Sequence, residues 1–217
     1  MTIQKTNDKS SLQSVFEEIN IHLLEDEKPS IYVNKISNEE FFNEYPFNLL
    51  LKLKTTEQSP KHHPEGSVWN HTMLVIDAAA DVRDKSNNPR VFMWAALLHD
   101  IGKADTTKIR KGRITSYDHD KVGAELSEKF LMEFISDNIN FIEQVRVLVR
   151  WHMQILFVVN NLPFADIEGM KQYADINEVA LFGLCDRLGR LGADRKHEEK
   201  NINKFIQKIN NTNGNSD

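Results

Sequence analysis

Cysteine is almost absent from this sequence, since Cys185 is the only one in 217 residues. A lone cysteine excludes an internal disulfide and the paired-cysteine spacing of a zinc finger. Apolar runs are short as well, and none approaches the roughly 20 residues of a membrane-spanning helix. The polar N-terminus, MTIQKTNDKS, has no signal-peptide core. We therefore expect a globular protein that works in the cytoplasm and has no membrane partner.

Basic residues are also outnumbered by acidic residues. The sequence has 27 Lys and Arg residues against 32 Asp and Glu residues, a formal net charge of -5. A protein that coats nucleic acid needs a basic surface, so the composition argues against that class. It does not exclude a small nucleotide or phosphoester substrate, nor an RNA end, although the acidic composition makes the RNA end the less favoured partner. The composition carries no signal for a particular oligomeric state.

Helical periodicity runs along almost the whole chain, and it predicts an all-α fold. Ser37 and Glu40 form a capping box for one short helix, and Pro46 starts another. The segment 108–117, KIRKGRITSY, predicts a small β-hairpin around Lys111–Gly112. Apolar residues three and four apart predict the remaining helices at 11–26, 67–85, 89–101, 119–136, 140–158, 164–173, 177–190 and 197–210.

Six residues with metal-binding side chains lie on the apolar stripes of these helices. In chain order they are His71, His99, Asp100, His119, His152 and Asp186. A buried polar side chain costs free energy unless a partner satisfies it, and an ionised carboxylate costs most. Any one of the six, taken alone, is more often a hydrogen-bonded core residue. One shared metal would satisfy them all, and half of the eight histidines of the chain belong to the set.

The adjacent pair His99–Asp100 strengthens the metal interpretation. Neighbouring residues on a helix point about 100° apart, so both side chains can touch one ion only at the end of the helix. The surrounding run, LLHDIGK over 97–103, is an apolar helix followed by the pair and then by Gly102, which stops the helix.

At this run the chain resembles the HD-domain metal-dependent phosphohydrolases, with His71 matching the first histidine of their motif and Asp186 the last aspartate. The chain is still more similar to the HD region of bacterial CCA-adding tRNA nucleotidyltransferases. The similarity covers roughly residues 45–195. Its segments are HHPEGSVWNHT at 62–72, LLHDIGKADTT at 97–107, YDHDKVGAE at 117–125 and CDRLGR at 185–190.

The resemblance implies an HD-domain helical bundle that forms a phosphohydrolase domain over 45–196. We expect an N-terminal helical appendage over 1–44, and a C-terminal helix with a disordered tail over 197–217. The tRNA enzymes carry a nucleotidyltransferase head before the HD region. The short N-terminal stretch here has no Gly-Ser loop and no paired Asp-x-Asp, so we carry over only the hydrolytic half.

The ligand types suggest which metals the site would hold. His71, His99, Asp100 and Asp186 would hold a first ion and leave positions open for water or a substrate oxygen. Asp100 has two oxygens and could bridge to a second ion on His119 and His152, which match the two extra histidines of two-metal HD proteins. Nitrogen and oxygen ligands without thiolate suit Mn, Fe, Co, Ni or Zn, with Mg as a further candidate. One ion and two ions are equally compatible, because His119 and His152 can instead bind phosphate or donate a proton.

Several cationic and loop residues are candidates for contact with the substrate. Lys103 follows the HD pair where the family places a phosphate-facing lysine, although a helix end also favours a solvated cation. Arg187 suits bidentate phosphate contacts, and His62 and His63 resemble the tRNA-enzyme motif and would rim the pocket. The basic segment 108–113 could steer a nucleotide, but a charged turn is usually only solvated.

The sequence therefore predicts a metal-dependent phosphohydrolase. Asp100, Lys103 and His119 are its expected catalytic residues, and metal-activated water attacks phosphorus. Its substrate would be a 2′,3′-cyclic phosphodiester or a nucleotide phosphate. The alternative is a catalytically silent regulatory module that binds metal or nucleotide, which the complete ligand set makes less favoured.

Overall fold

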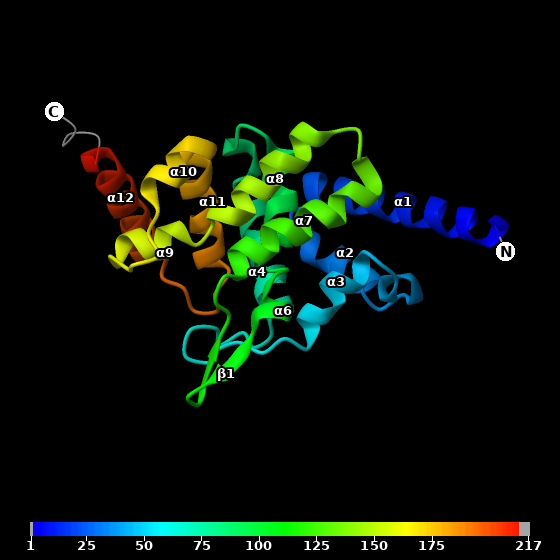
Figure 1. Cartoon of the computed structure of the whole chain (residues 1–217), viewed down its shortest axis with the longest axis horizontal. Coiled ribbons are helices and arrows are strands. Elements are labelled where there is room, and N and C mark those ends of the chain that lie inside the picture. Colours follow the sequence, from blue (N-terminus) through cyan, green and yellow to red (C-terminus); the bar gives the residue numbers. More distant parts are fainter. Residues whose placement is uncertain (1, 213–217) are drawn as a thin grey trace.

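The computed structural model describes the backbone of residues 2–212 and the side chains of residues 11–211. Its helices are α1 (Thr2–Glu25), α2 (Pro29–Ile36), α3 (Phe47–Leu51), α4 (Val68–Ala80), α5 (Pro89–Leu98), α6 (Lys103–Thr106), α7 (His119–Ile135), α8 (Ile139–Trp151), α9 (Gln154–Val159), α10 (Ile167–Tyr173), α11 (Ile176–Leu188) and α12 (Arg195–Thr212). Short 3₁₀ turns occupy Glu40–Asn43, Lys52–Lys54 and Arg83–Lys85. The all-α prediction is confirmed (Figure 1).

Helix α5 is the centre of the bundle. Every residue from Val91 to Leu98 is buried, as expected for a helix that is apolar on all sides. Asn88 caps its first turn by accepting a hydrogen bond from the Val91 backbone N–H. Helices α1, α4, α8 and α11 contact α5 directly, and α7 packs against α8. This central helix carries His99 at its C-terminal end.

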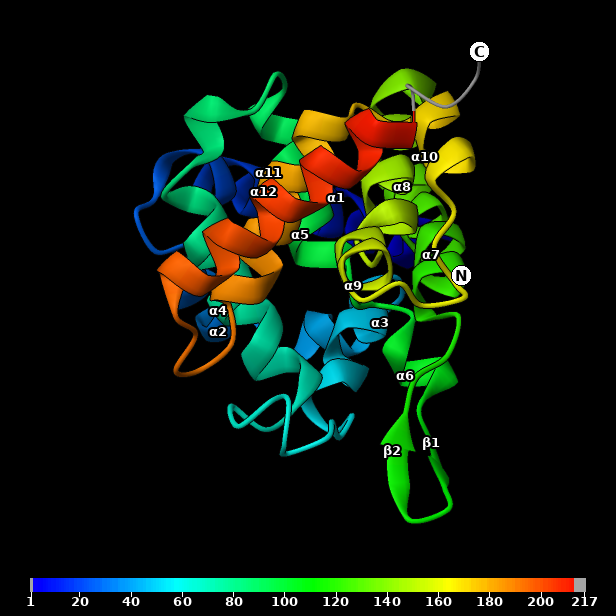
Figure 2. The same cartoon turned by 90° about the vertical axis from the view of Figure 1, so that its left-hand side faces the viewer.

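The predicted hairpin is present between α6 and α7, and it projects from the helical body (Figure 2). Strands β1 (Lys108–Arg110) and β2 (Arg113–Thr115) pair antiparallel, with Ile109 opposite Ile114. Lys111 and Gly112 both have positive φ, 49° and 73°. Two consecutive positive φ values are the requirement of the two-residue turn that suits a twisted hairpin.

Two of the predicted helices differ from the structure. Ser37 does not begin a helix: it ends α2, a helix that the periodicity did not reveal, and its hydroxyl donates to the Asn34 carbonyl. The helix predicted over 140–158 is broken between Trp151 and Gln154. Neither glycine nor proline marks this break, so tertiary packing of α9 against α11 and α12 decides it.

The C-terminal end also differs from expectation. Residues 211 and 212, which lie beyond the predicted end of the last helix, continue α12. The rest of the predicted disordered tail, 213–217, lies outside the described residues. Among residues 2–212, no helix combines the length and apolarity that crossing a bilayer requires.

Candidate metal centre

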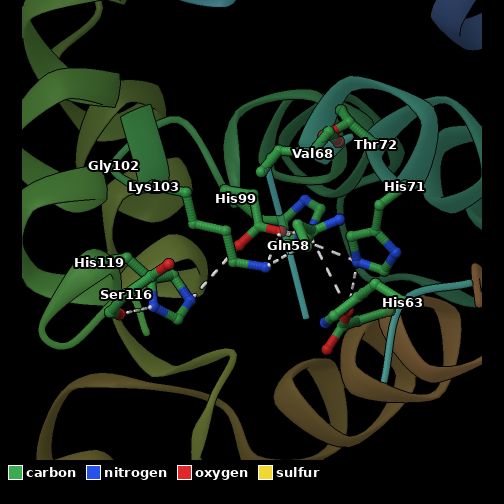
Figure 3. Close-up of polar contacts among 12 residues, drawn as sticks. Gln58, His63, Val68, His71, Thr72, His99, Gly102, Lys103, Ser116 and His119 are labelled. Carbon is green, nitrogen blue, oxygen red and sulfur yellow. Dashed lines mark hydrogen bonds and ion pairs between the residues drawn. The ribbon is translucent and has the colours of Figure 1, made fainter. Parts of the chain in front are cut away.

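The six predicted ligands come together at one buried site, although they belong to five separate parts of the chain. His71 is on α4, His99 and Asp100 follow α5, His119 begins α7, His152 follows α8 and Asp186 is on α11. Each is at most 8% exposed. Figure 3 shows His71 and His119 on opposite sides of His99 and Lys103. The described residues form three groups of possible metal ligands here. One lies around Asp186, one lies around Asp100, and the third, His63 with Glu65, shares His71 with the first.

The first group consists of His71, His99 and Asp186. His71 Nε2 lies 2.9 Å from Asp186 Oδ1, and His99 Nε2 lies 4.0 Å from the same oxygen. Ligands about 2.1 Å from one ion are roughly 3.0 Å apart when they subtend 90° and about 4.2 Å apart when they are opposite. The observed separations of 2.9 and 4.0 Å are close to these two values, and all three atoms lie within 4.8 Å of one another, so they are placed to share one ion.

The second group consists of Asp100, His119 and His152. Asp100 Oδ1 lies 3.4 Å from His119 Nε2 and 3.8 Å from His152 Nε2. Its other oxygen, Oδ2, lies 3.3 Å from His99 Nε2 and 3.8 Å from His71 Nε2. One carboxylate oxygen of Asp100 therefore faces each of these two groups.

Backbone hydrogen bonds orient three of the imidazole rings. The Nδ1 atoms of His99, His119 and His152 lie 2.7–2.9 Å from the carbonyl oxygens of Ala96, Ser116 and Val149, each three residues earlier. An Nδ1–H that donates to a carbonyl leaves the Nε2 lone pair free to bind metal. His99 and His152 are C-cap residues, so the ends of α5 and α8 position these two rings.

Three buried nitrogen atoms show whether a metal fits this site. His99 Nε2 has no hydrogen-bond partner in the described part of the chain. His119 Nε2 and His152 Nε2 are 3.2 Å apart, and with Nδ1 protonated on both rings their lone pairs face each other. Facing lone pairs repel each other unless a proton or a metal ion lies between them. The donor set therefore fits a divalent metal ion, which these imidazole nitrogens and carboxylate oxygens would hold.

The charge states of the side chains also suit metal ligands. Burial lowers the pKa of His119 to about 3 and lowers that of His152. Burial alone would raise the pKa of Asp100, but the Lys103 ammonium and the neighbouring imidazoles hold it well below its usual range. Neutral imidazoles and ionised carboxylates are the forms that bind metal.

His71 is the exception among the histidines. Burial opposes its protonation, yet hydrogen bonds with Asp186 and Glu65 outweigh burial and raise its pKa. The carboxylates of Asp186 and Glu65 concentrate negative charge around the His71 ring. A divalent ion would take the place of the proton that this charge favours.

Lys103 points into the site rather than into solvent. Its Nζ lies 2.7 Å from Asp100 Oδ2 and donates to Gln58 Oε1, also at 2.7 Å (Figure 3). An ammonium has three N–H donors, so one remains for another oxygen. Sequence reasoning did not identify Gln58, because a lone glutamine in a loop has no periodic or motif signal.

The remaining predicted substrate contacts separate into those near the site and those away from it. His63 lies beside His71, with ring centroids 4.9 Å apart. His62 is exposed, and no hydrogen bond, ion pair or ring contact joins it to the site within residues 11–211. Arg187 forms an ion pair with Glu198 of α12, an arrangement that does not support a phosphate contact.

Arg190, rather than Arg187, approaches the cluster. Its Nη2 lies 3.9 Å from Asp186 Oδ2. Its Nε is buried without a hydrogen-bond partner among the described side chains. Arg190 lies four residues after Asp186 and two residues beyond the end of α11, and this spacing was the available signal.

Glu65 has a larger part in the site than its loop position suggests. Its Oε1 lies 2.8 Å from His63 Nδ1 and 3.1 Å from His71 Nδ1. Burial would raise the pKa of this carboxyl, but these histidines and a backbone hydrogen bond lower it to about 2. A carboxylate behind a metal-binding histidine fixes the orientation of the ring.

Gly102 allows α7 to approach the HD pair closely. A Cβ at this position would lie 2.3 Å from the His119 carbonyl oxygen and 2.5 Å from the Gly123 nitrogen. The contact is between backbones, so only glycine leaves the first turn of α7 where it is. This close approach places His119 beside Asp100.

Comparison with known proteins adds an independent observation. A family model described as HD domain matches residues 68–190. The multifunctional CCA protein of Halorhodospira halophila (strain DSM 244 / SL1) is 36% identical over 100 residues, covering 44% of this chain and 21% of that protein. The multifunctional CCA protein of Acidovorax sp. (strain JS42) is 30% identical over 152 residues, covering 66% of this chain and 34% of that protein.

A third relative matches a shorter segment. The multifunctional CCA protein of Actinobacillus pleuropneumoniae serotype 5b (strain L20) is 45% identical over 51 residues, which is 24% of this chain and 12% of that protein. These matches span about a third or less of the length of the relatives.

Proposed function

The chain belongs to the HD domain family, whose members are generally metal-dependent phosphohydrolases, and on that premise we propose that it hydrolyses a nucleotide-type phosphate ester. The ester would be a 2′,3′-cyclic phosphodiester or a nucleotide phosphate. The similarity to the HD regions of multifunctional CCA proteins supports this substrate class.

The position of Asp100 is the observation that carries the proposal. Its two oxygens face the two ligand groups separately, at 3.3 Å from His99 Nε2 and 3.4 Å from His119 Nε2. Imidazole nitrogens and carboxylate oxygens at such separations are suited to hold divalent cations. A role in packing would not require two histidine lone pairs to face each other.

The side chains around the cluster have distinct roles in the proposed reaction. A bound divalent cation supplies an electrophile and lowers the pKa of water in contact with it. Lys103 holds Asp100 ionised and has one N–H donor left for a phosphoryl oxygen. Arg190, with its buried and unpaired Nε, is a second donor for that phosphoryl group.

We propose two ions rather than one. Asp100, His119 and His152 form a complete second ligand group, and the contact between the two Nε2 atoms supports a cation there. In the one-ion alternative His119 and His152 act on the substrate, and His119 protonates the leaving oxygen. The metal is an open-coordination ion such as Mn, Fe, Co, Ni or Zn.

A phosphoester panel tests the proposal. The substrates are 2′,3′-cyclic AMP, AMP, a dinucleoside polyphosphate and an aryl phosphodiester, each assayed with Mn, Fe(II), Ni or Mg. We expect turnover that depends on the added metal and is abolished in Asp100→Ala and His99→Ala. In both variants the metal content should fall while the circular dichroism spectrum is retained.

Asp137→Ala is the matched control, because it removes an exposed aspartate on the connection between α7 and α8. It should keep full activity and metal content. Retained activity in Asp100→Ala with full metal occupancy would refute the assignment. Tight nucleotide binding without product formation, in protein shown to hold metal, would instead establish a binding module.

A further inference from the structure

The hairpin that projects from the body carries a dense group of cations, and we call residues Thr107–Ser116 the basic arm. Its segment 108–113 contains Lys108, Arg110, Lys111 and Arg113 without an acidic residue. Taking these four from the 27 basic residues leaves 23 against 32 acidic residues, a net charge of -9 for the rest of the chain. The arm is therefore a positively charged segment of a protein whose remaining residues carry a net negative charge.

The arm arises directly from the metal centre. It begins four residues after Lys103 and ends three residues before His119. Its base is closed by a hydrogen bond between the Thr107 and Ser116 hydroxyls, 2.7 Å apart, and the Ser116 carbonyl holds the His119 ring. From this base the arm extends away from the helices (Figure 2). A ligand that leaves the centre along the arm would pass its cations one after another.

The cations of the arm are available for a ligand. All four are exposed, and none forms an ion pair with a carboxylate within residues 11–211. The guanidinium of Arg110 lies over the Tyr117 ring, 4.8 Å from its centroid. A cation that served the fold would be expected to meet one of the 32 acidic residues of the chain.

Apolar and aromatic surface accompanies this charge. Ile109 is 74% exposed and Tyr117 is 53% exposed. A surface groove of about 440 Å³ lies beside the arm, and Lys108, Ile109 and Ile114 of the arm line it. Its opposite lining includes Lys52, which is paired with Asp105, and one acidic residue, Glu57. Basic grooves with aromatic and apolar side chains are typical of proteins that bind single-stranded nucleic acid, whose bases stack while their phosphates are neutralised.

We propose that the basic arm docks a single-stranded RNA whose terminal phosphate ester enters the metal centre. The inference rests on the proposed function and narrows its substrate class. A mononucleotide has its phosphate at the metal centre and offers no anion to the arm. Four residues of strand rise about 13 Å, so the tip at Lys111 lies well beyond the base of the arm. An oligonucleotide provides one phosphate for each further residue along that distance.

Direct binding of a strand to the full-length protein is the first test. The probe is fluorescein-labelled decauridylate with a free 3′ hydroxyl, which contains no terminal ester to hydrolyse. The variant Lys111→Asn/Arg113→Gln removes two cations from the arm, and asparagine tolerates the positive φ at position 111. The control Lys200→Gln/Lys204→Gln removes two exposed cations from α12.

We expect the arm variant to bind the strand at least tenfold more weakly than the control does. Each phosphate contact contributes about 0.7 to the slope of log K against log salt concentration for a single strand. Loss of two contacts should therefore make the slope shallower by about 1.4. Equal affinity and equal slope in the two double variants would overturn the proposal and leave the arm a solvated turn. Displacement of the strand by inorganic polyphosphate as readily as by unlabelled decauridylate would exclude recognition of nucleic acid.

Turnover separates this inference from the proposed function. The two substitutions in the arm should lower kcat/KM for a decanucleotide that ends in a 2′,3′-cyclic phosphate. This reduction should be at least tenfold greater than the reduction in kcat/KM for 2′,3′-cyclic AMP. An equal change for both substrates would refute docking by the arm while hydrolysis stands. Strand binding that depends on the arm, in a protein that hydrolyses no ester with any metal, would support the arm and refute the proposed function.

Discussion

Gly102→Ala is the substitution that tests most directly how the backbone builds the metal centre. The added Cβ would lie 2.3 Å from the His119 carbonyl oxygen and 2.5 Å from the Gly123 nitrogen. Contacts of real Cβ atoms essentially never fall below 3.0 Å, so the carbonyl must move by about 0.7 Å, the difference between 3.0 and 2.3 Å. Both neighbours are backbone atoms, and no side chain can rotate to make room.

Two opposing effects set the size of the loss in stability. Gly102 has φ -71° and ψ -15°, which alanine adopts easily. Replacing such a glycine with alanine stabilises a protein by about 0.4–1 kcal/mol, because it reduces the conformational entropy of the unfolded chain. Overpacking a buried site destabilises it by about 1–3 kcal/mol. Because backbone must move here, the upper part of that range applies, and we expect a net destabilisation of about 1–2 kcal/mol.

The function should suffer more than the stability. Ligand side chains must be held to within about 0.5 Å of their working geometry. A shift of about 0.7 Å in the first turn of α7 moves His119 relative to Asp100. We therefore expect Gly102→Ala to lose the second ion and most of its turnover while it still folds.

Urea unfolding followed by tryptophan fluorescence, together with metal analysis, measures both effects. Gly123→Ala is the matched control, because its Cβ would meet the Val149 side chain at 3.3 Å and the His99 carbonyl at 3.4 Å. Those contacts are tight but tolerable, and alanine gains about 1 kcal/mol of helix propensity there. It should be close to neutral. A Gly102→Ala protein with unchanged stability and two bound ions would refute this account of the site.

Three further predictions concern single side chains. His119→Ala should reduce the metal content from two ions per chain to one, and an unchanged stoichiometry would make His119 a residue that contacts substrate or transfers a proton. Glu65→Gln should weaken metal binding about 10–100-fold in a competition titration, because the carboxylate behind His71 orients its ring; unaltered affinity would contradict that role. Phe16→Ala should destabilise the protein by about 3–5 kcal/mol, since Phe16 is fully buried and stacks on Trp94 at 4.5 Å. The control is Ile21→Ala, at a position 49% exposed on the same helix, which should change the free energy of unfolding by less than about 0.5 kcal/mol. Equal changes for the two variants would show that α1 does not belong to the core.

The periodicity of the sequence was sufficient to predict an all-α fold, because each helix must bury its own apolar stripe and this requirement is local. Helices α5, α7 and α11 lie close to their predicted ranges. The hairpin was predictable for a similar reason, since its turn needs residues that accept positive φ, and Gly112 supplies one. Helix α2 was missed although Pro29 occupies its first turn.

The order of the six candidate ligands, and the end of α5 at the HD pair, could be predicted from the sequence alone. Their distances could not, because His71 and Asp186 are 115 residues apart and only the packing of α4 against α11 brings them to 2.9 Å. The choice of Arg190 over Arg187, the contacts of Glu65 and Gln58, and the break after α8 also depend on tertiary contacts. Local sequence determines which face of a helix is buried, whereas the partner that each buried polar group meets is determined by the helix packed against it.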